Sequence, residues 1–118
     1  MIVLSLNCRR LASLPKKHYV RRMVEEQAPN ILFLQESMGK GDIIVVELET
    51  MLKVWSFVYA DAFGKSGGLL MGWKINRFLF QTSWAIESGL SVTLFSIELK
   101  VALCFVNVYG PYVDRESF

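Results

Sequence analysis

The sequence is poor in the residues that build disulfide frameworks and metal clusters. It has two cysteines, Cys8 and Cys104, and a single histidine, His18. Two cysteines do not make a disulfide scaffold, and no zinc-ligand spacing is present. Cysteine usage of this kind is typical of a reducing, intracellular compartment, which includes the nucleus.

Long hydrophobic runs are also missing. The longest, residues 101–106 (VALCFV), has six apolar residues, whereas a membrane-spanning helix needs about 18 or more. Residues 1–6 are apolar except for Ser5, but no basic segment precedes them and polar residues follow at once, so we expect a strand there and not a signal peptide. The sequence therefore predicts no membrane partner.

The composition has few charges for its hydrophobic content. Hydrophobic residues make up 53% of the 118 residues and charged residues 20%, which excludes a disordered or low-complexity chain. The length allows one domain at most. The apolar surplus is high for so small a domain, and it suits strands covered on both faces or a piece of a larger domain.

The net charge of +2 is too small to indicate nucleic-acid binding by itself. The distribution of the charges is more informative, because residues 1–22 contain six of the 13 basic residues and no acidic one. These are Arg9, Arg10, Lys16, Lys17, Arg21 and Arg22. The block forms either a positive patch for an anionic partner or a solvated helix face.

Hydrophobic periodicity predicts the order β-α-β-α followed by a β-meander. We expect one helix from Ser13 to the residue before Pro29 and a second over about 43–53 with Asp42 as its N-cap. The β-branched stretch 43–46 leaves a strand open as an alternative there. Strands are expected at residues 2–6, 31–34, 55–60, 68–74, 78–86, 91–98 and 101–109.

Three of these runs, residues 2–6, 31–34 and 101–106, have the composition of buried strands, and each ends in polar residues. The residues that follow are Asn7, the pair Gln35 and Glu36, and the pair Asn107 and Tyr109. Ligands of open α/β sheets bind outside the carboxyl ends of strands, so these side chains could converge on one edge. Oxygen donors with one carboxylate suit a hard cation such as Mg²⁺. The simpler alternative is that strands end in polar residues because loops are polar.

Four stretches of the sequence together resemble a known superfamily. They are LSLNCRRL, PNILFLQES, FGKSGGLLMGWK and FVNVYGPY, and they resemble the endonuclease/exonuclease/phosphatase superfamily (DNase I-like). Within it, the sequence is most similar to the endonuclease domain of LINE-type (non-LTR) retrotransposons of plants. The resemblance implies the N-terminal half of a four-layer α/β sandwich that hydrolyses phosphodiesters, nicking DNA, with Mg²⁺ or Mn²⁺.

The resemblance also implies roles for residues that match the superfamily's motifs. Asn7 would orient the metal or the phosphate, Glu36 would be the metal ligand, and Tyr109 would contact the scissile phosphate. DNA is the implied partner, and the residues expected to contact it are Arg9, Arg10, Lys16 and Lys17.

The sequence departs from the superfamily in several places. Leu6 stands where tryptophan is common, and Arg10 stands where the related domains have glycine, which predicts strain in that turn. The Gly-Asp-x-Asn and Asp-His segments are absent. We therefore expect residues 1–118 to be one partial domain, truncated at its C-terminus, inactive alone and in need of its C-terminal half as a partner. The alternative is a non-catalytic retroelement remnant, at most a weak nucleic-acid-binding module.

The missing half leads to a structural expectation as well. If one of the two sheets of the sandwich is absent, the inner face of the other, with Val101, Leu103 and Phe105, is exposed. The chain should then be only marginally stable.

Overall fold

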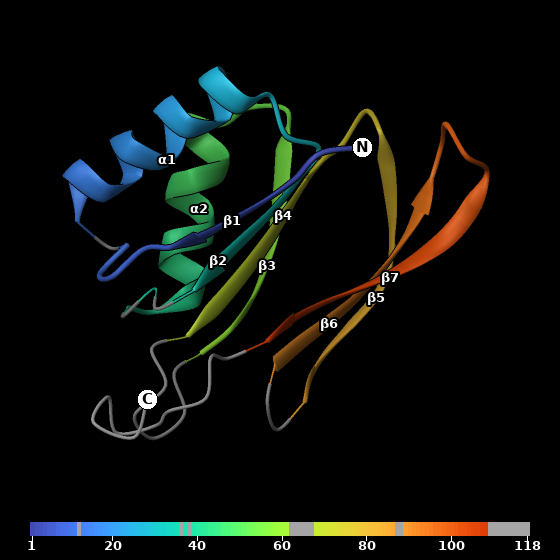
Figure 1. Ribbon diagram of the computed structural model, residues 1–118. Helices are drawn as coiled ribbons and strands as arrows, with labels where there is room; N and C mark the ends of the chain where they lie inside the picture. Colours follow the sequence, from blue (N-terminus) through green and yellow to red (C-terminus); the bar gives the residue numbers. More distant parts are fainter. Residues whose placement is uncertain (12, 36, 38, 62–67, 87–88, 109–118) are drawn as a thin grey trace, which may run out of the picture.

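The structure of the protein, a computed structural model, describes residues 1–11, 13–35, 37, 39–61, 68–86 and 89–108. Within these ranges the expected β-α-β-α order followed by antiparallel strands is confirmed (Figure 1). The elements are β1 (Val3–Asn7), α1 (Leu14–Gln27), β2 (Ile31–Gln35), α2 (Gly41–Met51), β3 (Trp55–Ala60), β4 (Leu69–Lys74), β5 (Phe78–Ile86), β6 (Gly89–Ser96) and β7 (Val101–Val108).

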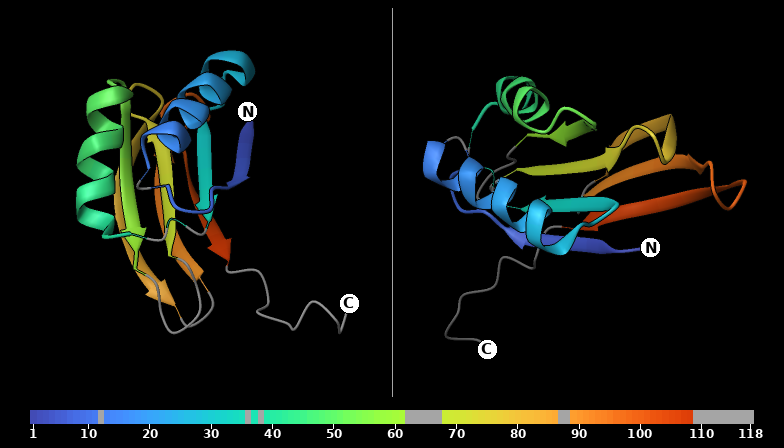
Figure 2. Two further views of the ribbon diagram at one scale, coloured as in Figure 1. Left: turned by 90° about the vertical axis from the view of Figure 1, so that its left-hand side faces the viewer. Right: turned by 90° about the horizontal axis from the view of Figure 1, so that it is seen from above.

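The strands form two sheets that pack face to face. The first has the order β1-β2-β4-β3, in which β1 is parallel to β2 and the other pairs are antiparallel. The second is the antiparallel sheet β5-β6-β7. Both helices cover the outer face of the first sheet, so the described chain has three layers: helices, sheet and sheet (Figure 2). Neither helix is long and apolar enough to cross a membrane.

The helix α1 begins and ends where its sequence predicts. Ser13 occupies the N-cap position in an extended conformation, and Pro15 lies in the first turn, where its missing N–H costs nothing. The helix ends at Ala28, which has a left-handed φ of 46° and is followed by Pro29.

The helix α2 confirms the helical interpretation of residues 43–46, but its start differs from the prediction. Lys40 is the N-cap residue, and Asp42 lies inside the first turn, where a carboxylate is still favourable at the helix N-terminus. The cap comes instead from a distant residue, because the backbone N–H of Gly41 donates a hydrogen bond to Asp61 Oδ1 at 2.9 Å.

Two hydrophobic clusters hold the layers together. The strand β2 explains both, because its alternate side chains point to opposite faces of the sheet. Leu32 and Leu34 pack in the cluster beneath the helices, whereas Ile31 and the half-buried Phe33 pack in the cluster between the sheets. A four-residue apolar run is therefore what a strand buried on both faces requires.

Two expectations about burial are wrong. The runs 2–6 and 101–106 are not buried on both faces, because β1 and β7 are the outermost strands of their sheets. Val3, Val101 and Val106 remain 45%, 47% and 42% exposed. The expectation that one sheet is absent is also wrong, since both sheets are present and Phe105 packs against the cluster between them.

Candidate functional site

The carboxyl ends of β1 and β2 lie next to each other at one end of the first sheet. The two strands are parallel, and Asn7 is the register partner of Gln35. Parallel pairing places the carboxyl ends of both strands at the same end of the sheet. The convergence expected for these two strand ends is confirmed. Asn7 is exposed there. Glu36, the expected metal ligand, is the next residue after Gln35 and lies outside the described residues.

The carboxyl end of β7, in the second sheet, lies at the same end of the fold. Asn107 is 1% exposed, and its Nδ2 donates hydrogen bonds to the backbone oxygens of Leu34 at 3.3 Å and Leu70 at 2.9 Å. Its Oδ1 accepts a hydrogen bond from Gln35 Nε2 at 2.9 Å. The side chain of Asn107 therefore clamps the second sheet to two strands of the first.

Gln35 extends this network to β1, because its Nε2 also donates to Ser5 Oγ at 2.9 Å. We call Ser5, Asn7, Gln35 and Asn107 the rim. Sequence reasoning identified Asn107 only as a polar strand end and missed Ser5 altogether. The signal for Asn107 was an amide one residue beyond a six-residue apolar run, a position where a polar group must find buried partners. Tyr109, two residues further, lies outside the described residues.

The basic residues near the rim divide into exposed and buried ones. Arg9, Arg10 and Lys16 are exposed, and the first two directly follow Asn7 and Cys8 in the chain. Lys17 differs from the expectation of a phosphate contact, because it is 4% exposed and forms an ion pair with Glu47 of α2. Its ammonium group links α1 to α2, and its burial limits the contact that it could make with a DNA backbone.

Arg10 shows the backbone strain that the glycine position of the related domains predicts. Its φ is 60°, in the left-handed region where a side chain is unfavourable. Its carbonyl oxygen accepts a hydrogen bond from Ser13 N at 3.0 Å. The turn between β1 and α1 thus keeps this conformation although the residue is arginine.

Cys8 lies beside the rim but is not suited to nucleophilic chemistry. Burial raises the pKa of its thiol from the usual 9.0 to about 11, and the positive charge of Lys16 lowers it by a smaller amount. The reactive form of a cysteine is the thiolate, so Cys8 is a neutral core residue at physiological pH.

A separate groove lies on the opposite side of the fold. It has a volume of about 380 Å³ and is lined by Asp42, Val45, Phe57, Val58, Tyr59 and Ser83. None of the rim residues lines it, so it does not belong to the same site.

Sequence comparisons find no relative for this chain. No protein-family profile matches the sequence. No curated protein matches it significantly either.

Solved structures match its fold. The human Nocturnin catalytic domain with a bound sulfate anion has a TM-score of 0.66 and 15% identity over 88% of this chain. A D. rerio TDP2 humanized by 14 mutations has a TM-score of 0.66 and 14% identity over 95%. ANGEL2, described as a 2',3'-cyclic phosphatase, has a TM-score of 0.62 and 14% identity over 88%.

The chain spans 47%, 49% and 39% of these three structures, in the same order. All three belong to the endonuclease/exonuclease/phosphatase superfamily. The fold is therefore the DNase I-like α/β sandwich, and the chain corresponds to part of that domain.

Proposed function

We propose that residues 1–118 form the part of a metal-dependent phosphodiesterase domain that binds the cation and the nucleic-acid backbone. The observation that carries this proposal is the rim, in which the ends of β1, β2 and β7 meet. The DNase I-like fold and the neighbour described as a 2',3'-cyclic phosphatase support phosphoester chemistry.

The donors at the rim are compatible with a hard cation only if Glu36 joins them. Within the described ranges, no three Asp, Glu, His or Cys side chains gather into a metal-binding group. The rim itself offers neutral amide and hydroxyl oxygens. These donors together with one carboxylate suit Mg²⁺ or Mn²⁺, and the single charge predicts weak binding. A bound cation would polarise a phosphoryl oxygen of the substrate.

The remaining residues would hold the substrate. The exposed amide of Asn7 would donate a hydrogen bond to a phosphoryl oxygen, and the hydroxyl of Tyr109 would contact the scissile phosphate. Gln35 and Asn107 are positioning residues, because their side-chain hydrogen bonds lie within the protein and fix the end of β2. Glu36 follows directly from that fixed strand end.

The exposed basic residues would bind the DNA backbone. Arg9, Arg10 and Lys16 are exposed near the rim, and Lys and Arg side chains supply most of the sequence-independent affinity for DNA. Lys17 is left out of this surface because of its burial and its ion pair with Glu47.

Hydrolysis would need groups that this sequence does not contain. It has neither a Gly-Asp-x-Asn nor an Asp-His segment, and general acid–base help is worth about 10²–10⁴-fold in rate. We therefore propose that the chain binds DNA without cutting it. The four matching stretches support an origin in a LINE-type retrotransposon. A non-catalytic remnant that binds DNA without any cation is the second candidate, favoured by the same missing segments.

Binding of a short fluorescent DNA duplex, with and without Mg²⁺, tests the proposal. We expect Mg²⁺ to tighten binding by the wild-type chain but not by Glu36→Gln, and we expect no nicking of plasmid DNA by either. Glu98→Gln is the matched control, because Glu98 is an exposed carboxylate in the turn before β7, at the end of that strand opposite Asn107.

Two results would contradict the assignment of Glu36 as a metal ligand. An equal response to Mg²⁺ in Glu36→Gln would contradict the metal assignment. Wild-type binding that ignores Mg²⁺ would contradict it as well and would favour the non-catalytic remnant.

A further inference from the structure

The four outermost strands of the two sheets are not protected equally. On β3, the backbone N–H of Phe57 donates a hydrogen bond to Glu49 Oε2 at 2.9 Å, which satisfies a group of the strand edge. On β5, the register shifts between Phe80 and Thr82, and such an irregularity discourages pairing with another strand.

Among the residues that the structure describes, none protects the outermost strands β1 and β7 in this way. Neither contains a charged residue or a proline, which are the usual devices against edge pairing. Ile2 O accepts from Ile31 N at 3.3 Å, and Cys8 N donates to Gln35 O at 2.8 Å, so the backbone groups of the two residues that flank β1 face β2. By the two-residue alternation of a strand, the backbone groups of Val3, Ser5 and Asn7 face the open edge.

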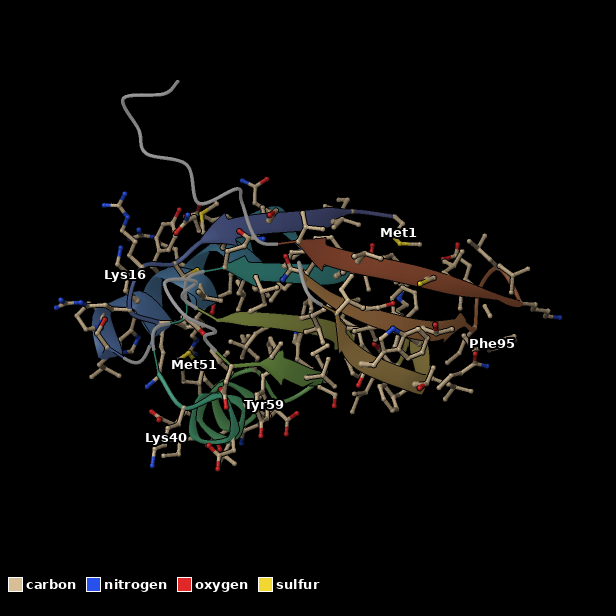
Figure 3. The ribbon with its side chains drawn as sticks, turned by 90° about the horizontal axis from the view of Figure 1, so that it is seen from below. Met1, Lys16, Lys40, Met51, Tyr59 and Phe95 are labelled. Atoms are coloured by element: carbon tan, nitrogen blue, oxygen red, sulfur yellow. The ribbon has the colours of Figure 1, made fainter. Side chains whose placement is uncertain are left out.

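These two open edges lie on the same side of the sandwich. Figure 3 shows β1 and β7 along the same side of the fold, with both arrows pointing toward the same end. The hydrogen bond between Gln35 and Asn107 agrees with this, since Gln35 belongs to the neighbour of β1. Phe33 and Phe105, which belong to the cluster between the sheets, are only partly buried.

We propose that the occupant of these edges is a second copy of this chain. A two-fold axis along the strand direction would pair β1 of each copy with β7 of the other, in parallel, and would extend both sheets at once. Because a two-fold contact is reciprocal, the assembly is complete with two copies. Only the protected strands β3 and β5 would remain as edges. Two copies would also have about the length of the human Nocturnin or the D. rerio TDP2 structure, of which one copy spans 47% and 49%.

The mass in solution tests the proposal directly. The dimer has twice the 13.5 kDa of one chain. We expect light scattering after gel filtration to give that doubled mass for the wild type and 13.5 kDa for Val3→Lys and Val106→Lys. Leu79→Lys is the control, because Leu79 is 54% exposed on β5, away from both open edges. A wild-type monomer, or a dimer broken by Leu79→Lys and kept by the edge variants, would overturn the proposal.

Hydrogen exchange gives a second test that needs no substitution. The amides of Val3, Ser5 and Asn7 should exchange at least about tenfold more slowly when the concentration is raised from mostly monomer to mostly dimer. Amides of the central strand β4 should not change. Exchange at the β1 edge that is independent of concentration would contradict the pairing and would leave the edges to a different polypeptide.

Discussion

The side chains of Gln35 and Asn107 join the two sheets, with Gln35 Nε2 donating to Asn107 Oδ1 at 2.9 Å. This contact connects residues 72 positions apart in the sequence. It fixes the strand end that leads into Glu36, so the stability of the fold and the geometry of the proposed metal site depend on the same amides.

Replacing Asn107 by alanine should destabilise the fold strongly. The substitution removes the donor to the Leu34 and Leu70 carbonyls and the acceptor for Gln35. Buried groups left without partners cost about 1–3 kcal/mol each, so we expect a loss of ~2–4 kcal/mol in the free energy of unfolding. Urea denaturation measures it. Asn76→Ala, at an exposed turn, is the control and should change stability by less than about 0.5 kcal/mol. Equal effects of the two substitutions would contradict the conclusion that Asn107 holds the two sheets together.

Replacing Arg10 by glycine should stabilise the fold. Glycine adopts a φ of 60° without strain, and the relief should exceed the entropic cost by ~0.5–1 kcal/mol. Thermal denaturation of Arg10→Gly and Arg9→Gly provides the comparison, because both variants lose one positive charge from the same turn. A lower melting temperature for Arg10→Gly than for Arg9→Gly would show that the turn is not strained.

The stability of the protein should fall in alkaline solution because of Cys8. The pKa of this thiol is about 11 in the fold against 9.0 ordinarily. The folded state therefore holds the proton more tightly, and its contribution is complete below pH 9 and lost as the pH rises toward 11. The loss amounts to roughly 2–3 kcal/mol. Urea denaturation of the wild type and Cys8→Ala, from about pH 8 to about pH 10.5, should show a smaller decline in the variant. Parallel declines would contradict this assignment.

The salt dependence of DNA binding should distinguish two neighbouring lysines. Each phosphate contact adds about 0.9 to the slope of log K against log salt on duplex DNA. Lys16→Met should therefore reduce the slope by about 0.9. Lys17→Met should leave it unchanged, because the Lys17 ammonium group is committed to Glu47. Fluorescence anisotropy over a range of salt concentrations measures both. The reverse result would place the DNA on another face of α1.

The order of the elements could be predicted from the sequence because it depends on local patterns. Each of these patterns depends on only a few consecutive residues. Examples are the ILFL run, the proline after α1 and the alternation in β3. Parallel pairing then brought Asn7 and Gln35 together as expected.

Burial could not be predicted in the same way, because it depends on the position of a strand within its sheet. The β7 sequence is apolar enough for a central strand, yet β7 is the outermost one. Lys17 illustrates the same limit, because its ion pair depends on Glu47, 30 residues away in the chain.

The most direct test of the account is the position of a bound cation. Mn²⁺ broadens NMR signals of nearby nuclei, so titration of the labelled chain locates the site. We expect selective broadening of the Asn7 and Gln35 backbone amide signals in the wild type and its loss in Glu36→Gln, with Glu98→Gln behaving as the wild type. Broadening centred on Asp42 and Asp61 instead, or persisting at Asn7 in Glu36→Gln, would contradict the proposal that the rim and Glu36 form the metal site.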